Sequence, residues 1–216
     1  MNPPKNPRVP SLLRCSTLVL LGLFGGCNVV PPAQDDPTQY FVLSDAVSPD
    51  AVVAPAAQGG LRIGLRTVRV ESYLKNRPMV VRTAANAVTF EDYRRWAEPV
   101  DAAIGRVLRT RLVVAPGVAQ VYTEPFPFDQ ARDFDVSIDV IRFEGALAAP
   151  GKYVASEQAM IEISTPGANS RVVARKLFVA PEQAWDGKDF DQLAALLTGD
   201  VADLGQEILS SLPAKP

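Results

Sequence analysis

The spacing of apolar residues changes its period along the chain, and this change limits the folds that the chain can adopt. Between Phe134 and Val140 every second residue is apolar, which is typical of a strand with one buried face. In two other segments, 96–112 and 190–212, apolar residues recur at intervals of three and four, as in amphipathic helices. The pattern therefore predicts an α+β fold: a mostly antiparallel sheet with two amphipathic helices packed on one face.

Shorter apolar runs separated by turn residues predict the remaining strands. We expect them at 40–43, 61–65, 79–82, 87–90, 118–122, 155–164 and 171–179, the last two as a hairpin around 165–169. After residue 65 the apolar phase reverses at Val68 and Val70, which predicts a bulge near Thr67. Proline and glycine predict a loop over 44–60 and a turn over 73–78.

The first 27 residues have the order of a lipoprotein signal peptide. Residues 1–14 carry Lys and Arg but no acid, and the apolar run 18–24 that follows is far shorter than the roughly 20 residues that span a bilayer. Gly25 and Gly26 lead directly into Cys27, which resembles a lipobox with Phe24 at the usual leucine position. We therefore expect cleavage before Cys27 and a covalent lipid on it.

With cleavage before Cys27, the chain would have three parts. They are a signal peptide over 1–26, a lipidated tether over 27–38 and one folded domain over 39–213. Loss of the leader removes only positive charge, so the mature chain is mildly acidic, and no basic cluster suggests nucleic-acid binding. Acyl chains on Cys27, rather than protein charge, are therefore expected to hold the protein on a membrane.

The residues that commonly carry chemistry are scarce. The chain has no histidine, and both of its cysteines, Cys15 and Cys27, precede the folded part, which excludes a disulfide framework or zinc site there. Asp133, Asp135, Asp139 and Glu144 have the spacing of a calcium loop, but Ile138 occupies the place where that loop needs glycine. We interpret these acids as the solvated face of a strand, and expect no enzymatic activity, metal or cofactor.

The two tryptophans could bind a ligand or a partner, or they could belong to the core. Trp96 falls on the apolar stripe of the first predicted helix, which favours a core role. Trp185 lies in a predicted loop over 181–187, where partial exposure at an interface and burial are equally open.

Several runs occur in an order that resembles one known family. After Cys27 come Tyr40-Phe41-Val42-Leu43, then Ile63 to Val70, Tyr73-Leu74, Arg77-Pro78-Met79-Val80-Val81-Arg82, and Tyr93-Arg94-Arg95-Trp96-Ala97-Glu98-Pro99. The chain thereby resembles the ABC-type transport auxiliary lipoproteins, the PqiC/YmbA-like group. The resemblance marks these residues as a structural or interface motif: Tyr73, Leu74, Arg77, Pro78, Arg82, Trp96 and Pro99.

The resemblance implies a non-catalytic accessory role in lipid transport between membranes. Its expected partners are an MCE-domain (mammalian-cell-entry) protein, a permease and an ATPase, and its expected location is the periplasmic face of the outer membrane. Asn28 after the cysteine agrees with outer-membrane sorting. Because MCE proteins form rings, a homo-oligomer is expected. A scaffolding or regulatory lipoprotein of another envelope machine, such as a cell-wall synthase activator, is the alternative.

Overall fold

The computed structural model of the protein describes residues 35–44 and 59–214. The chain divides into two compact units, Met1–Pro37 and Thr38–Pro216. The predicted signal peptide, Cys27 and most of the predicted tether and 44–60 loop lie outside the described residues. In the first unit the described residues 35–37 form no helix or strand. No helix in the described part of the chain is long and apolar enough to cross a membrane.

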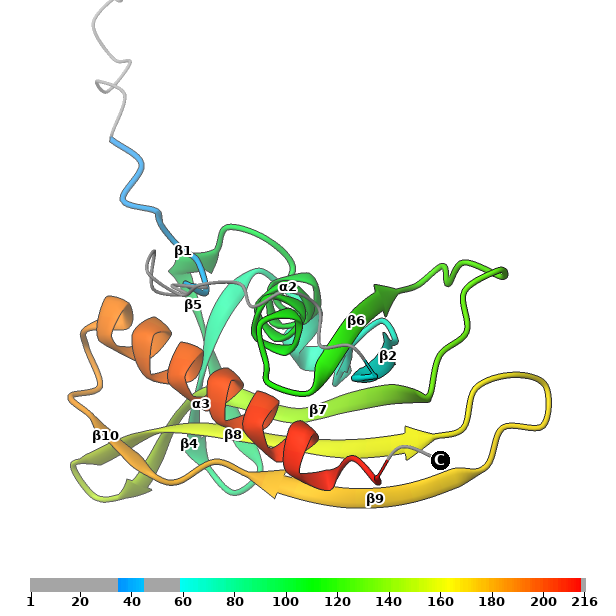
Figure 1. Ribbon diagram of the computed structural model, residues 1–216. Helices are drawn as coiled ribbons and strands as arrows, with labels where there is room; N and C mark the ends of the chain where they lie inside the picture. The colour runs from blue at the N-terminus through cyan, green and yellow to red at the C-terminus, as the bar shows by residue number, and fades with distance from the viewer. Residues whose placement is uncertain (1–34, 45–58, 215–216) are drawn as a thin grey trace, which may run out of the picture. The chain divides into compact units, whose positions relative to one another are not determined.

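The second unit contains ten strands and two α-helices among its described residues (Figure 1), which confirms the predicted α+β class. In chain order they are β1 (Gln39–Phe41), β2 (Leu61–Leu65), β3 (Arg69–Val70), the 3-10 helix η1 (Ser72–Lys75), β4 (Pro78–Ala84), β5 (Ala87–Trp96), α2 (Val100–Val113), β6 (Val118–Thr123), β7 (Phe134–Ala149), β8 (Lys152–Ser164), β9 (Val172–Val179), β10 (Gln183–Trp185) and α3 (Phe190–Ser211).

All ten strands belong to one sheet built around β7 and β8. These two strands pair antiparallel over nearly their whole length, and β9 and β10 both pair antiparallel with β8. On its other side β7 meets three strands in parallel: β2 at its start, β3 further along and β4 towards its end. Outside these, β5 pairs antiparallel with β4, β1 pairs parallel with β5, and β6 pairs parallel with β2. The long pairings are antiparallel, as predicted, but the sheet is mixed.

Several element boundaries differ from the predictions. The predicted hairpin of β8 and β9 is confirmed, but β7 continues beyond Val140 to Ala149 and forms a second, longer hairpin with β8. No bulge occurs at Thr67; β2 ends at Leu65, and a separate strand begins at Arg69. Strand β5 extends to Trp96, so that α2 begins only after Pro99, a residue that lacks a backbone N–H and can precede a helix without loss.

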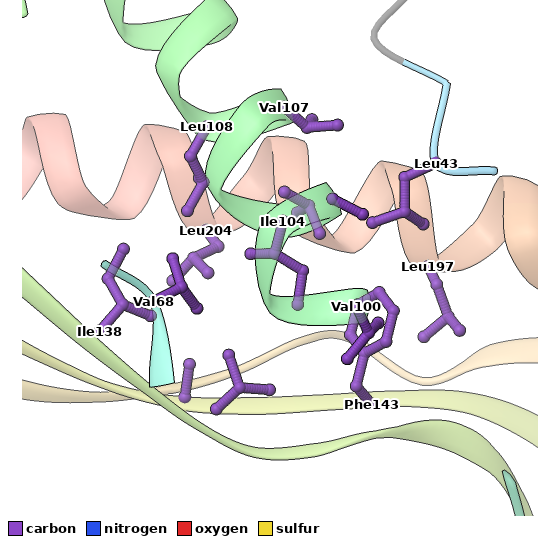
Figure 2. Close-up of a cluster of buried hydrophobic side chains, with 14 of the residues drawn as sticks. Leu43, Val68, Val100, Ile104, Val107, Leu108, Ile138, Phe143, Leu197 and Leu204 are labelled. Atoms are coloured by element: carbon purple, nitrogen blue, oxygen red, sulfur yellow. The ribbon is translucent and has the colours of Figure 1, made fainter. Parts of the chain in front are cut away.

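Both helices cover the same face of the sheet, as predicted, and we call this the helix-covered face (Figure 1). Figure 2 shows Ile104 and Leu108 of α2, Leu197 and Leu204 of α3, and Phe143 of β7 in one apolar cluster between these elements. All five side chains are buried. The opposite face, which neither helix covers, is called the open face. Alternation along β7 places apolar side chains on the helix-covered face and acids on the open face.

The start of α3 explains why Trp185 is buried. Asp189 caps the helix, and its side chain accepts hydrogen bonds from the backbone N–H groups of Asp191 and Gln192 at 3.0 and 3.1 Å. Its backbone carbonyl accepts one from the Trp185 indole N–H at 2.6 Å. The indole lies against Gly145, where a Cβ would come within 2.5 Å of the ring. The predicted loop is therefore wrong for Trp185, and of its two open alternatives the structure shows burial, because β10 pairs with β8 and directs this side chain into the core.

Candidate interaction site

Two members of the predicted motif, Tyr73 and Arg82, meet on the open face. Arg82 Nη2 donates to the Tyr73 hydroxyl at 3.3 Å, and that hydroxyl donates to the backbone carbonyl of Ile141 at 3.1 Å. Arg82 Nε also donates to Glu144, whose side chain is fully buried, and Nη1 donates to the Ala85 carbonyl at 3.1 Å. The cluster therefore uses every nitrogen of the Arg82 guanidinium in holding η1, β4 and β7 together.

Burial and the neighbouring charges shift the protonation of this cluster. Burial, with the negative charge of Glu144 as a second cause, raises the pKa of the Tyr73 hydroxyl to about 12. The hydrogen bond to Glu144 raises the pKa of Arg82 above its ordinary value. Tyr73 is therefore a neutral hydrogen-bond donor at physiological pH, and Arg82 and Glu144 form an ion pair.

The other motif residues support the fold at separate places. Leu74 is buried in the core, while Arg77 is exposed and its backbone carbonyl accepts a hydrogen bond from the Trp96 N–H at 2.8 Å. Pro78 opens β4, and the carbonyl of Pro99 accepts the first hydrogen bond of α2. The Trp96 ring is buried at the end of β5, with its centroid 5.8 Å from that of Phe143. Its expected place on the helix is wrong, because the helix starts four residues later.

A row of arginine–carboxylate pairs, which the sequence did not reveal, runs along the open face. Its members are Arg62–Asp133 (3.3 Å), Arg66–Asp135 (3.0 Å), Arg69–Asp139 and Arg82–Glu144. The acids lie on β7 or just before it, and the arginines lie on or beside the strands that pair with β7 in parallel. Parallel register places the two sets opposite one another, since Arg69 is the direct neighbour of Asp139.

Asp135 has the most enclosed position in this row. Its carboxylate is fully buried and accepts hydrogen bonds from Arg66 Nη2 at 3.0 Å and Arg132 Nε at 2.7 Å. Gly64 lies beside it in β2, and a Cβ there would come within 2.3 Å of an Asp135 oxygen. The Arg132 guanidinium also stacks on the Phe126 ring at 4.1 Å. Glycine in β2 thus provides the space for a buried carboxylate between two arginines.

The predicted solvated acidic face is therefore wrong for two of its members. Asp135 and Glu144 are 0% and 1% exposed, because arginines from neighbouring strands cover them. The alternate acids on β7 were visible in the sequence, as were Arg62, Arg66 and Arg69. The missing information was the parallel pairing between segments about seventy residues apart. In the described residues no group of three or more His, Cys, Asp or Glu side chains could hold a metal ion.

Two further acids are buried on the helix-covered face without a basic partner in the described structure. Both carboxylate oxygens of Glu157, on β8, are buried and accept no hydrogen bond. Asp200, on α3, accepts one hydrogen bond from Gln183 Nε2 at 2.6 Å, and its other oxygen has no partner. Both acids occupy positions where the pattern of their element predicts an apolar residue. Glu157 lies on the same face of β8 as Ala155 and Ala159, and Asp200 lies on the buried side of α3 beside Leu197 and Val201. An acid at an otherwise apolar position of the pattern is the feature of the sequence that could have predicted these two buried carboxyls, which were not among the predictions.

Desolvation dominates the protonation of this acidic pair. Burial raises the pKa of Glu157 well above its ordinary value, and the charges of Asp200 and Asp203 raise it further. Burial also raises the pKa of Asp200 to about 6. On the helix-covered face both carboxyls therefore hold a proton to a higher pH than they would in water. The acids of the arginine–carboxylate row on the open face instead form ion pairs.

The chain is matched by one family model and by solved structures of the same fold. The model of the ABC-type transport auxiliary lipoprotein component matches residues 41–209, which is most of the chain. A crystal structure of a Xanthomonas campestris protein, described with the family model DUF330, has a TM-score of 0.64 at 16% identity, over 79% of this chain and 92% of that one. A second crystal structure, of an uncharacterized protein, has a TM-score of 0.59 at 19% identity, over 80% and 97%.

These structural likenesses concern the fold alone, whereas the family match concerns the sequence. A search of curated proteins found no match to this chain. The family match extends from the end of β1 into the last turn of α3, so it includes the motif, the arginine–carboxylate row and both helices. The chain belongs to the family of ABC-type transport auxiliary lipoprotein components.

Proposed function

We propose that the protein is a non-catalytic accessory component of an MCE/ABC-type system that transports lipids between membranes, anchored to the periplasmic face of the outer membrane. The observation that carries the proposal is the family match over residues 41–209. The anchor is a lipid on Cys27, supported by the basic, apolar and small residues that precede it. An MCE-domain protein, a permease and an ATPase are the proposed partners.

The proposed homo-oligomer has support from the edge of the sheet. Among the described strands, β9 pairs only with β8, so the backbone groups of its other edge are available to a further strand. Near its start, Val172 and Val173 are 49% and 45% exposed. An edge of this kind suits pairing with another copy of the chain, and repeated weak contacts around a ring of MCE subunits would add avidity.

Fractionation and co-purification from envelopes test the proposal. The wild-type protein is expected in the outer-membrane fraction, together with an MCE-domain protein, and light scattering is expected to give more than one copy per particle. Cys27→Ala removes the acylated sulfur and should leave an unprocessed or released protein. Cys15→Ala is the matched control, because it changes the other cysteine within the leader and should alter nothing.

Two results would contradict the proposal. An unchanged mass and fractionation of Cys27→Ala would exclude acylation at that residue. Co-purification with a cell-wall synthase and never with an MCE-domain protein would favour the scaffolding alternative.

A further inference from the structure

A hollow of about 390 Å³ opens on the sheet near the end of the β7–β8 hairpin. Its lining includes Arg82 of β4, Arg142 and Ala146 of β7, Ser156 and Gln158 of β8, and Val179 of β9. Ser156 and Gln158 alternate with Glu157, which points to the helices, and they therefore belong to the open face. The volume falls in the range of small-molecule sites.

A bulge in β7 brings a positive charge to this hollow. The register shifts by one residue between the pairs Val140–Ala159 and Arg142–Gln158, so Ile141 is the extra residue. Phe143, which follows Arg142, is buried in the core, and this places Arg142 on the open face. A bulge of this kind redirects a side chain, and here it directs an arginine into a hollow.

Arg142 differs from the other arginine of the hollow in its partners. Arg82 is paired with Glu144, which neutralises its charge. The Arg142 side chain has no hydrogen bond or ion pair within the described part of the chain, and the same holds for its neighbours Ser156 and Gln158. Glu182, which also lines the hollow, is paired with Lys152. The hollow thus carries one uncompensated positive charge beside two neutral polar groups.

The remaining lining is apolar and lies beside this charge. Ala146, Leu147 and Val179 provide the accessible apolar surface, and Val179 is 54% exposed, whereas Val154, paired with Ala146, is buried beneath it. A small anion such as free phosphate would use Arg142 and leave this apolar surface in water. A ligand that has both an anionic group and a hydrocarbon chain would use both parts, because burial of apolar surface adds about 25 cal/mol per Å².

We propose that this hollow binds an anionic phospholipid, with the headgroup phosphate on Arg142 and the adjoining part of an acyl chain against Ala146, Leu147 and Val179. The proposal rests on the lipid-transport function proposed above and extends it by giving the described domain a lipid contact of its own. Arginine suits the phosphate because its planar guanidinium can donate two parallel hydrogen bonds.

Native mass spectrometry of the full lipoprotein in a mild non-ionic detergent tests the site with three probes. Lysophosphatidylglycerol has both the phosphate and the chain, monoacylglycerol has the chain alone, and glycerol phosphate has the phosphate alone. We expect lysophosphatidylglycerol to bind at least about tenfold more tightly than either of the others. Arg142→Gln should weaken that binding by about tenfold or more. Arg175→Gln removes an equal charge from the Glu162 pair outside the hollow and should leave binding unchanged.

Each other outcome overturns a specific part of the proposal. Equal binding of glycerol phosphate and lysophosphatidylglycerol would make the hollow a simple anion site. Equal loss in both variants would reduce the effect to overall charge, and unchanged binding in Arg142→Gln would remove Arg142 from the site. Co-purification with the MCE-domain protein is measured on the same samples. A protein that binds its partner but not the lipid overturns this inference alone, and one that binds the lipid without any MCE partner overturns only the proposed transport function.

Discussion

The two faces of the sheet treat buried carboxylates in opposite ways. On the open face, Asp135 is buried between Arg66 and Arg132. On the helix-covered face, Glu157 is equally buried, but its carboxylate has no hydrogen-bond partner among the described residues. Both side chains are carboxylates of nearly equal burial, so the neighbouring strands and helices determine which partners each group has. On the open face the neighbours are positively charged arginines. On the helix-covered face α3 contributes apolar side chains and the acidic Asp200.

The two faces of the sheet also differ in the source of their stability. The helix-covered face gains free energy chiefly from apolar burial, which is non-directional and tolerates an occasional polar group at a cost. The open face depends on ion pairs in which each partner compensates the desolvation of the other. Removal of one member therefore leaves the other as a buried charge without a partner. Substitutions on the two faces should therefore change the free energy of unfolding by different amounts, in different directions and with different dependence on pH.

The largest effect is expected from Trp96→Ala on the helix-covered side. The substitution removes a buried ring that packs on Phe143, and such truncations cost about 3–5 kcal/mol in the free energy of unfolding. Thermal unfolding followed by circular dichroism should give a clearly lower Tm. Phe90→Ala on the same strand is the control, because Phe90 is 39% exposed and should cost much less. A Trp96→Ala variant that stays stable but no longer binds its partner would make Trp96 an interface residue.

A smaller loss is expected from Asp135→Ala on the open face. It leaves Arg66 and Arg132 without their shared carboxylate, and the expected cost is about 2–3 kcal/mol, since Arg66 retains access to water and to Glu124. Urea denaturation gives this free energy directly. Asp135 is fully buried, so a loss below about 0.5 kcal/mol would mean that the pairing contributes little beyond the cost of its desolvation.

The matched control for Asp135→Ala is Arg69→Ala, in the same row. The side chains of Arg69 and Asp139 are 67% and 44% exposed, and exposed pairs contribute only about 0–1 kcal/mol. A cost equal to that of Asp135→Ala would show that the row acts as one cooperative network rather than as separate pairs.

These contrasts also explain what the sequence could predict. Periodicity was sufficient for α3 and for the strands near 134–140 and 155–179, because a long amphipathic pattern has one interpretation. It failed for Trp185, since a three-residue strand such as β10 is too short to show a period and depends on its pairing with β8. It failed for Trp96 because the apolar spacing continued from β5 into α2 across Pro99.

The candidate site was less predictable than the fold for a related reason. The motif residues Tyr73 and Arg82 were recognised, but their partner Glu144 lies more than sixty residues away in the chain. The orientation of Arg142 could not be predicted from the sequence, because it depends on a bulge at Ile141 that only the pairing of β7 with β8 creates. Local pattern identifies which residues share a face, whereas parallel register and bulges determine which of them meet.

The last predicted effect, which has the opposite sign, is stabilisation by Glu157→Gln. The raised pKa of Glu157 means that the folded protein binds a proton more tightly there than the unfolded chain does. The stability linked to that proton is complete below the ordinary pKa of 4.5 and is lost as the pH rises through the raised pKa. The wild-type Tm should therefore fall as the pH rises from about 4.5 through the raised pKa of Glu157. Glutamine carries no proton to lose, so Glu157→Gln should weaken this pH dependence.

Near pH 7.5 the Glu157→Gln variant should have a higher Tm than the wild type, because burial disfavours the charged carboxylate and glutamine carries no charge. Near pH 4.5 the gain should vanish. Some pH dependence should persist in the variant, since the pKa of Asp200 is also raised, to about 6. Glu162→Gln is the control on the opposite face of the same strand, where the acid is partly exposed and paired with Arg175. It should give no stabilisation at either pH. If both variants changed the Tm equally, the contrast between the two faces would be wrong, and overall charge would account for the pH dependence instead.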